Sequence, residues 1–294
     1  MKSVKDRFIK MNKVKFYDVT LRKNYLTIVG IASSFVTLVS FFVTADKITQ
    51  IDMKCLASIA IVLLILIYFY MWIKANQLQE AHLRVNQTKV NIRVGNIFAT
   101  RNEEINVIAV NDFYDTIADN RIISKSSLHG QYILKNANCI EEIDRVIASD
   151  PNLNNKVNIE EENVNRQVGK QKRYKLGSVV EIDSFVLTAF AKFDFQNKAF
   201  LSAREYVEFW MKFWENIDGI YAGRTINIPL IGVGITRFRD GKPTKQELLE
   251  IMLWTLKISG FHCTYANKSI NIEIFEPDAE EIDFYHIQHG NKFK

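Results

Sequence analysis

Three short stretches of this sequence combine glycine, hydroxyl, amide and charged side chains in a way that suits a phosphate-bearing ligand. The first follows the apolar run 105–110 and consists of Asn111, Asp112 and Phe113. The second precedes a predicted helix and consists of Ser126, Ser127, Leu128, His129 and Gly130. The third follows the apolar run 225–231 and consists of Gly232, Val233, Gly234, Ile235, Thr236 and Arg237. Ligands of α/β sheets bind beyond the carboxyl ends of the strands, so we expect these stretches to share one site.

The third stretch carries the clearest physical signal for phosphate binding. Gly232 and Gly234 let backbone N–H groups approach a phosphate closely, and Arg237 adds a charge-assisted contact. A tight turn without a ligand explains the same two glycines, and we give that interpretation equal weight. The sequence contains neither a G-x-x-x-x-G-K-S/T loop nor a complete dinucleotide fingerprint. The motifs alone therefore do not assign a class of nucleotide.

The sequence offers no positive evidence for catalysis or metal binding. It contains no G-x-S-x-G elbow, and Cys55, Cys139 and Cys263 have no context that marks a nucleophile. His286 and His289 lie three residues apart in a polar tail without a supporting acidic cluster. We therefore expect a binding protein rather than an enzyme, with no metal and no cofactor. The odd, scattered set of cysteines fits a reducing cytoplasm.

Strand-like and helix-like segments alternate from residue 90 onward, which predicts a layered α/β domain. Strands are expected at 91–94, 105–110, 184–193, 225–231 and 270–275, and helices at 140–148, 202–217 and 244–260. The aromatic side chains of 202–217 recur at helical spacing, so we expect them in the core rather than stacked on a ligand. Segment 151–175 is polar and rich in lysine, and it is expected to be a mobile loop.

The N-terminal part of the chain predicts a hairpin of two transmembrane helices. Segments 25–43 and 55–73 each contain 19 residues without a charge, about 28 Å of helix, which matches a hydrocarbon core of about 30 Å. The connection, 44–54, is short, and a cleaved signal peptide fits poorly because the first run starts late and a second follows. Residues 74–89 are expected to form a helical linker to a soluble domain at 90–294.

The distribution of Lys and Arg predicts how this hairpin is oriented. Eight basic residues lie within 1–24, whereas the connection carries only Lys47 and Lys54. The positive-inside rule then places both termini in the cytoplasm of a multi-pass protein of the inner membrane. Beside an apolar span, this basic arm indicates topology rather than nucleic-acid binding. Small residues around Gly30 favour close helix packing, either within the hairpin or by self-association between chains.

The order and spacing of the soluble elements resemble a divergent macro domain, the fold that binds ADP-ribose. The family's Gly-Asp-Ile element corresponds to Gly95-Asn96-Ile97, and its strand end Val-Asn-Ala-Ala-Asn corresponds to the stretch from Val110 to Phe113. Its glycine-rich pyrophosphate loop corresponds to 126–130, and its Pro-Ala-hydrophobic-Gly-Thr-Gly element to 229–235. The resemblance implies a macro-like three-layer domain with a mixed sheet. It adds Asn96 and Ile97 to the expected ligand contacts.

Three departures from the macro pattern argue against hydrolysis and favour altered ligand recognition. The aspartate that usually meets adenine is replaced by Asn96, and the second asparagine of hydrolytic macro domains is missing. The triple-glycine loop retains only Gly130, preceded by His129.

The whole chain, hairpin included, resembles the membrane effector of type II Thoeris antiphage systems, chiefly through 111–116 and 123–130. The resemblance implies that a partner TIR-domain enzyme consumes NAD and releases histidine–ADP-ribose. The macro-like domain would bind this signal, and the assembled effector would disrupt the inner membrane. A membrane-tethered ADP-ribosyl hydrolase and a structural anchor that recruits a partner are the alternatives.

Overall fold

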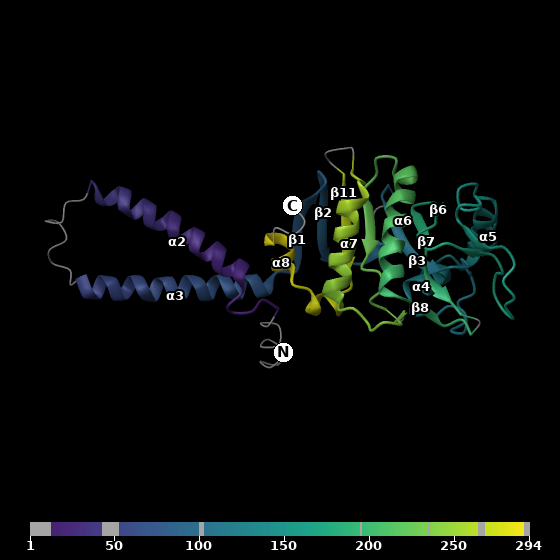
Figure 1. Ribbon diagram of the computed structural model, residues 1–294, viewed down its shortest axis with the longest axis horizontal. Helices are drawn as coiled ribbons and strands as arrows, with labels where there is room; N and C mark the ends of the chain where they lie inside the picture. The colour runs from purple at the N-terminus through teal and green to yellow at the C-terminus, as the bar shows by residue number, and fades with distance from the viewer. Residues whose placement is uncertain are drawn as a thin grey trace. The chain divides into compact units, whose positions relative to one another are not determined.

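The computed structural model describes residues 13–42, 53–99, 103–194, 196–234, 236–263 and 268–290 (Figure 1). The chain divides into two compact units. One comprises Met1–Ala81 with Asp283–Lys292, and the other comprises His82–Ile282 with Phe293–Lys294. The C-terminal segment, expected within a single domain at 90–294, therefore belongs mainly to the first unit.

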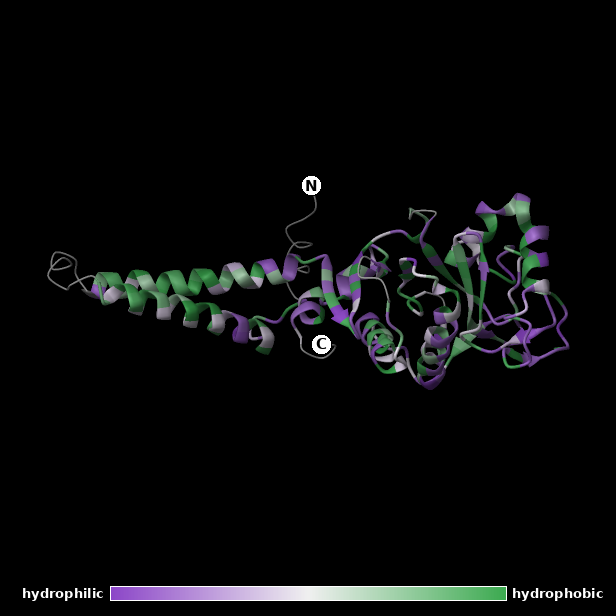
Figure 2. Ribbon diagram, turned by 90° about the horizontal axis from the view of Figure 1, so that it is seen from above, coloured by the Kyte–Doolittle hydropathy of each residue, from purple (hydrophilic) through white to green (hydrophobic). Residues whose placement is uncertain are grey.

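The first unit is built on two long helices, α2 (Val19–Ser40) and α3 (Met53–Gln77). The Asp18 side chain begins α2 by accepting a hydrogen bond from Leu21 N. Figure 2 colours both helices as predominantly hydrophobic, and most of their large apolar side chains are exposed. Lys54–Gln77 is long and apolar enough to cross a membrane, and its most apolar stretch of 18 residues has a mean hydropathy of 2.5. The helices confirm the two expected helical segments, while most of the 44–54 connection lies outside the described residues.

The C-terminal helix α8 (Phe284–His289) packs beside α3 in the same unit. A small buried cluster contains Val14, Leu21, Ala75 and Tyr285. The Tyr285 hydroxyl accepts a 2.7 Å hydrogen bond from the Asn24 side chain. These contacts join residues at opposite ends of the sequence.

The second unit contains a mixed sheet of nine strands, counted over the described residues. Its strands are β1 (Glu80–Val85), β2 (Thr88–Val94), β3 (Ile105–Asn111), β6 (Val179–Ile182), β7 (Phe185–Phe193), β8 (Ala199–Leu201), β9 (Ile226–Pro229), β10 (Arg237–Phe238) and β11 (Ser269–Ile274). Their order is β1-β2-β11-β9-β3-β7-β8-β10, with β6 also paired to β7. Strands β2, β11, β9, β3 and β7 run parallel to their neighbours in this series. The mixed α/β sheet confirms the expected fold class.

The expected helical linker at 74–89 is wrong beyond the end of α3. Residues 80–85 form β1, in which Ala81, Leu83 and Val85 are buried and the residues between them are exposed. This alternation has the period of two of a strand that covers a core with one face. Asn86 and Gln87 both have positive φ, 46° and 67°, as in a tight two-residue hairpin turn to β2.

Helices α6 (Ala203–Tyr221) and α7 (Lys245–Ser259) lie side by side on one face of the sheet (Figures 1 and 2). Each begins with a capping box, Ser202 with Glu205 and Thr244 with Glu247. Gly260, with φ of 77°, ends α7 as expected. The aromatic side chains of α6 are buried, which confirms their expected place in the core.

A row of four asparagines fixes the register of the central strands. Side-chain amides donate from Asn91 to Asn271 (2.8 Å), from Asn271 to Asn227 (2.8 Å) and from Asn227 to Asn106 (2.9 Å). The row crosses β2, β11, β9 and β3 near the N-terminal ends of the last three strands. Ladder pairing between β3 and β9 is confined to residues 105–106 and 226–227. Because these strands are parallel, the loops that follow them leave the sheet at the same edge.

Segment 151–175, expected to be a loop, contains a short antiparallel hairpin. Strands β4 (Ile159–Glu161) and β5 (Arg173–Tyr174) pair, and residues 162–172 connect them. The segment is not uniformly solvated, because Arg166 and Leu153 are buried. The helices preceding it are α4 (Leu128–Lys135) and α5 (Ile140–Ser149).

Candidate functional site

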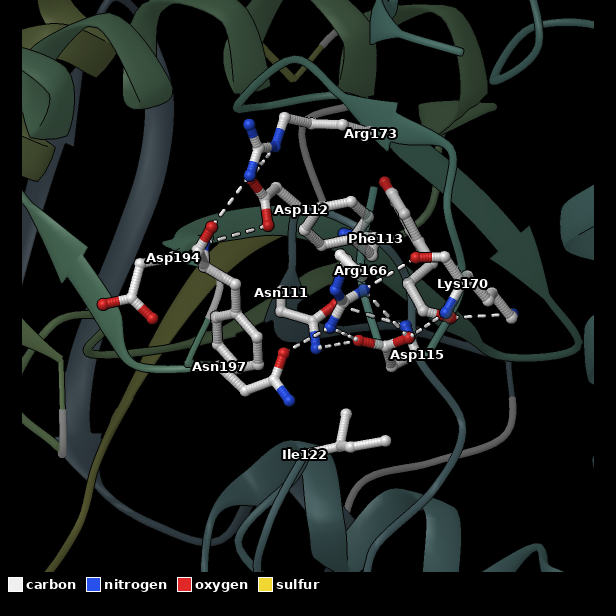
Figure 3. Close-up of polar contacts among 12 residues, drawn as sticks. Asn111, Asp112, Phe113, Asp115, Ile122, Arg166, Lys170, Arg173, Asp194 and Asn197 are labelled. Carbon is white, nitrogen blue, oxygen red and sulfur yellow. Dashed lines mark hydrogen bonds and ion pairs between the residues drawn. The ribbon is translucent and has the colours of Figure 1, made fainter. Parts of the chain in front are cut away.

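A buried polar cluster lies at the carboxyl end of β3, where the sequence predicts part of the ligand site (Figure 3). Asn111 is the last residue of β3, and its side-chain oxygen accepts hydrogen bonds from Phe113 N (3.1 Å) and Asp115 N (3.2 Å). Its amide nitrogen donates to Asp115 Oδ2 at 3.0 Å. The Asn111 side chain is therefore held in one orientation by the turn that follows it.

Asp115 is the centre of this cluster. Besides Asn111, its carboxylate accepts from Arg166 Nη2 (3.0 Å) and from Lys170 N (2.7 Å). The side chains of Asp115 and Arg166, which form an ion pair, are only 1% and 2% exposed. Arg166 also donates to the side chain of Asn197 at 2.7 Å. The pair thus joins three loops, those after β3, β4 and β7.

Asp112 is completely buried, and burial raises the pKa of its carboxyl to about 7, opposed chiefly by the nearby charge of Arg173. Oδ1 accepts a hydrogen bond from Phe193 N at 3.1 Å. Arg173 Nε lies 3.0 Å from Oδ2 without hydrogen-bond geometry, so within the described chain neither atom has a hydrogen-bond partner. Arg166 and Arg173 also approach the Phe113 ring, with Cζ 3.8 and 4.8 Å from its centroid.

A cavity of about 290 Å³ opens beside the cluster. Its lining combines the loop after β3, the N-terminal half of α5 and the β4–β5 loop, as Asp115, Thr116, Ile117, Ile140, Asp144, Gly169 and Lys170. Lys170 Nζ lies 2.6 Å from Asp144 Oδ1 and donates to the Tyr114 carbonyl at 2.7 Å. The cavity is therefore bordered by a cation that a neighbouring carboxylate holds.

The start of α4 lies next to this loop. Ser127 caps the helix by accepting from Gly130 N at 3.0 Å. A Cβ at Gly130 would lie 2.1 Å from the Ser124 carbonyl oxygen, so glycine is required for this close approach. Burial lowers the pKa of His129 to about 3, although a hydrogen bond to the Asp115 backbone acts in the opposite direction. His129 is therefore neutral at physiological pH.

The remaining residues of the second stretch lie at the entrance of α4. Leu128 is its first residue and is partly exposed, and the Ser126 side chain is exposed. The Ser126 and Ser124 hydroxyls lie 2.9 Å apart. His129 thus joins the polar cluster, whereas Ser126 faces solvent.

The glycine loop after β9 has the backbone geometry that its sequence predicts. Gly232 has a φ of +96°, and a Cβ there would lie 3.2 Å from the Tyr206 ring. The buried Tyr206 hydroxyl donates to the Ile231 carbonyl at 2.9 Å and so supports the loop from α6. Gly234 is exposed, and a Cβ at this position would meet no other atom within 4 Å.

The other members of the third stretch lie around this loop. Lys242 Nζ donates to the Val233 carbonyl at 3.1 Å, and Val233 is partly buried. Arg237 begins β10 and is exposed, Thr236 directly precedes that strand, and Ile235 lies outside the described residues. Among the described residues, no hydrogen bond or ion pair joins this loop to Asn111, Asp112 or Phe113.

Asn96 and Ile97 lie beyond the end of β2. Ile97 is buried, and the exposed Asn96 accepts a hydrogen bond from Phe98 N at 3.0 Å. Local sequence patterns do not identify the charged residues that complete the cluster, namely Asp115, Asp144, Arg166, Lys170 and Arg173. The available signal was the run of basic residues from 166 to 175 around Gly169, opposite the acidic residues that follow β3.

A larger hollow of about 690 Å³ is lined by α6 from Val207 to Asp218 and by residues 259–262 at the end of α7, and it includes Trp214 and Phe261. None of the residues predicted for the ligand site lines it. We place the candidate site at the carboxyl end of β3, because a predicted loop, buried charges and a cavity lie there.

The site and fold together define a macro domain, in which a polar loop and a glycine loop follow neighbouring parallel strands. Residues 90–274 match the family described as Thoeris protein ThsA, Macro domain. The chain is also 35% identical over 282 residues to the Thoeris protein ThsA of Bacillus amyloliquefaciens, with 94% of this chain and 91% of the relative covered. The chain therefore belongs to the Thoeris ThsA family with a macro domain.

Solved macrodomains of Oceanobacillus iheyensis show a weaker similarity. A mutant form has a TM-score of 0.43 and 14% identity, covering 72% of this chain and 96% of that chain. The form described as the macrodomain with ADP has a TM-score of 0.35 and 15% identity, covering 71% and 94%.

Proposed function

We propose that this protein is an antiphage defence effector that binds an ADP-ribose derivative through its macro domain. Histidine–ADP-ribose, released by a TIR-domain enzyme that consumes NAD, is the candidate signal. Ligand binding then drives self-association, and the N-terminal helices disrupt the inner membrane. The observation that carries this proposal is the attachment of a Thoeris ThsA macro domain to a pair of exposed apolar helices.

The two loops at the candidate site support recognition of a diphosphate. The loop after β9 exposes Gly234 and has positive φ at Gly232, so its backbone can approach an anion. The loop after β3 leaves the sheet at the same edge and carries Asp112 and Asp115, which hold the cations Arg173 and Arg166 of the β4–β5 hairpin beside it. These features suit a ligand that combines a sugar with phosphate groups.

The exposed apolar surface of α2 and α3 supports membrane insertion. Leu26, Ile31 and Phe35 of α2 are more than 60% exposed. An apolar surface of this extent is unfavourable in water, whereas lipid would cover it. The excess of Lys and Arg before α2 supports an orientation with both termini in the cytoplasm. Reporter fusions at each terminus test the orientation, and a periplasmic signal from either one contradicts it.

Calorimetry on the detergent-solubilised full chain tests ligand recognition. We expect binding of histidine–ADP-ribose and ADP-ribose, with weaker binding of AMP. Gly234→Glu should abolish binding without loss of stability, because the added side chain meets open space but places a carboxylate at the phosphate loop. Gly219→Glu is the matched control, since Gly219 is exposed on α6, has no positive φ and is also free of contacts within 4 Å. A full chain that binds none of these compounds contradicts the proposal.

We further propose that the domain is a receptor and not an enzyme. The Asn111 side-chain oxygen accepts two internal hydrogen bonds and its amide nitrogen donates one, and the pKa of His129, lowered to about 3 by burial, makes it a poor general base. The hydrolase alternative predicts product release from ADP-ribosylated protein that Asn111→Ala abolishes. The anchor alternative predicts full phage protection by Gly234→Glu. Deleting residues 1–77 tests the membrane mechanism, which requires that the deletion removes cellular toxicity.

A further inference from the structure

Three cations of the β4–β5 hairpin are each paired with a carboxylate on the rest of the domain. Figure 3 shows two of these pairs, Arg166 with Asp115 and Arg173 with Asp112. The N–O distances are 3.0 Å for Arg166–Asp115, 2.6 Å for Lys170–Asp144 and 3.0 Å for Arg173–Asp112. The hairpin therefore brings three positive charges to the carboxyl edge of β3. Each is balanced by an internal anion.

Solvent exposure separates an anchor from two accessible cations. The Arg166 side chain is 2% exposed and has three acceptors, Asp115, Asn197 and the Lys170 carbonyl. Lys170 and Arg173 are 29% and 23% exposed. Removing a buried guanidinium whose two terminal nitrogens are both hydrogen-bonded would be costly, so Arg166 fixes the hairpin. Lys170 and Arg173 are the cations that an incoming ligand can reach.

Neither accessible cation is tightly committed to its carboxylate. Asp144 is 40% exposed, so its attraction for Lys170 is weakened by water. The Arg173–Asp112 contact lacks hydrogen-bond geometry, and within the described chain Arg173 Nε has no hydrogen-bond partner. A ligand with better placed oxygen atoms can therefore replace either carboxylate.

The segment 126–130, at the start of α4, offers no free glycine N–H for a diphosphate, so charged side chains must supply that contact. Its one glycine, Gly130, is held against Ser124 and Lys125, where even a Cβ would clash. Gly130 N is already used by the Ser127 cap. Gly130 N is therefore not available as a donor to a diphosphate at this side of the site. The cavity of about 290 Å³ beside the loop after β3 is lined by Lys170.

We propose that Lys170 and Arg173 bind the diphosphate of the ligand, and that Asp144 and Asp112 compete with it for these two cations. This inference rests on the proposed function and adds specific binding residues to it. Both cations lie on one hairpin, so exchange of their partners couples ligand binding to the β4–β5 segment. Competition from Asp144 and Asp112 then lowers the apparent affinity of the domain for the ligand.

Neutralising one competitor gives a test with a distinctive sign. If Asp144 competes with the ligand, Asp144→Asn should tighten ADP-ribose binding several-fold. Lys170→Gln should weaken binding about tenfold or more, the range expected for a lost charged hydrogen bond. Neither change should alter binding of adenosine, which has no diphosphate. Arg204→Gln is the control, because Arg204 forms an exposed ion pair with Glu208 on α6 and does not touch the cluster.

Calorimetry on the full chain in detergent measures these affinities, and thermal unfolding verifies that each variant is folded. If wild type binds ADP-ribose and Asp144→Asn leaves the affinity unchanged or weakens it, the competition is refuted while the proposed function stands. If wild type binds no ADP-ribose derivative, the proposed function fails, and the variants are titrated with inorganic pyrophosphate. Tighter pyrophosphate binding by Asp144→Asn supports the inference, and no binding or no tightening overturns it.

Discussion

Asp112→Asn offers a direct test of the electrostatics of the cluster. Burial raises the pKa of the Asp112 carboxyl to about 7 from an ordinary value of 3.8. Between these two pH values the folded state retains a proton that the unfolded state has released. Stability of wild type therefore falls as the pH rises from about 4 to about 7, and this contribution levels off at higher pH.

The size of the effect follows from the same pKa. Between pH 5 and the folded pKa of about 7, the carboxyl is protonated in the folded state and ionised in the unfolded state. Over these two pH units the free energy of unfolding of wild type falls by about 2.7 kcal/mol. Asparagine has nearly the same shape and does not titrate. We therefore expect the stability of Asp112→Asn, relative to wild type, to increase by about 2–3 kcal/mol between pH 5 and pH 8.

Urea unfolding of the full chain in detergent, followed by tryptophan fluorescence, measures this difference at both pH values. Asp144→Asn is the matched control, because its side chain is 40% exposed and should show no such change. If the free energies of unfolding of wild type and Asp112→Asn differ by the same amount at pH 5 and at pH 8, the reasoning is refuted. The same ionisation bears on binding, because protonated Asp112 no longer holds Arg173. ADP-ribose should therefore bind wild type more tightly at pH 6 than at pH 8, and Asp112→Asn should lose this dependence.

Three further substitutions test the packing of the site and of the helices. Gly130→Ala should lower the free energy of unfolding by about 1–3 kcal/mol, because its Cβ would overlap the Ser124 carbonyl; thermal unfolding should show no loss in the control Gly234→Ala. Tyr206→Phe removes the hydrogen bond to the loop after β9 and should cost about 1 kcal/mol, and calorimetry should show weaker ADP-ribose binding. An unchanged affinity would mean that Tyr206 does not position the loop. Gly30→Leu meets open space within the chain, so it should leave the fold intact and reduce cross-linked oligomers in the membrane if this helix face joins two copies.

The sequence by itself determined the elements that depend on local pattern. Two uncharged apolar runs predict α2 and α3, because their length and composition favour helices regardless of the rest of the chain. Capping residues place the start of α7, and Gly260 places its end. Continuous apolar runs predict β3 and β7, and the glycine spacing predicts the special backbone of Gly232.

Local sequence pattern did not predict the conformation or burial of segments that contact residues far away in the sequence. Residues 80–85 are polar enough to continue a helix, yet pairing with β2 makes them a strand whose alternate side chains are buried. Segment 151–175 has the composition of a solvated loop, but Arg166 is buried because Asp115, 51 positions away, balances its charge. The asparagine row likewise acts only once four strands lie in register.

The candidate site divides in the same way between sequence and tertiary structure. Asn111, Asp112 and Gly232 are recognisable because each follows an apolar strand, a relation contained within a few residues. The charges that surround them come from the β4–β5 hairpin and α5, and only folding brings those segments to the end of β3. A charged side chain is stable in a buried place only when another part of the chain supplies its partner. The sequence therefore indicated the loops after β3 and β9, whereas the tertiary structure added the β4–β5 loop and decided which charges meet at the end of β3.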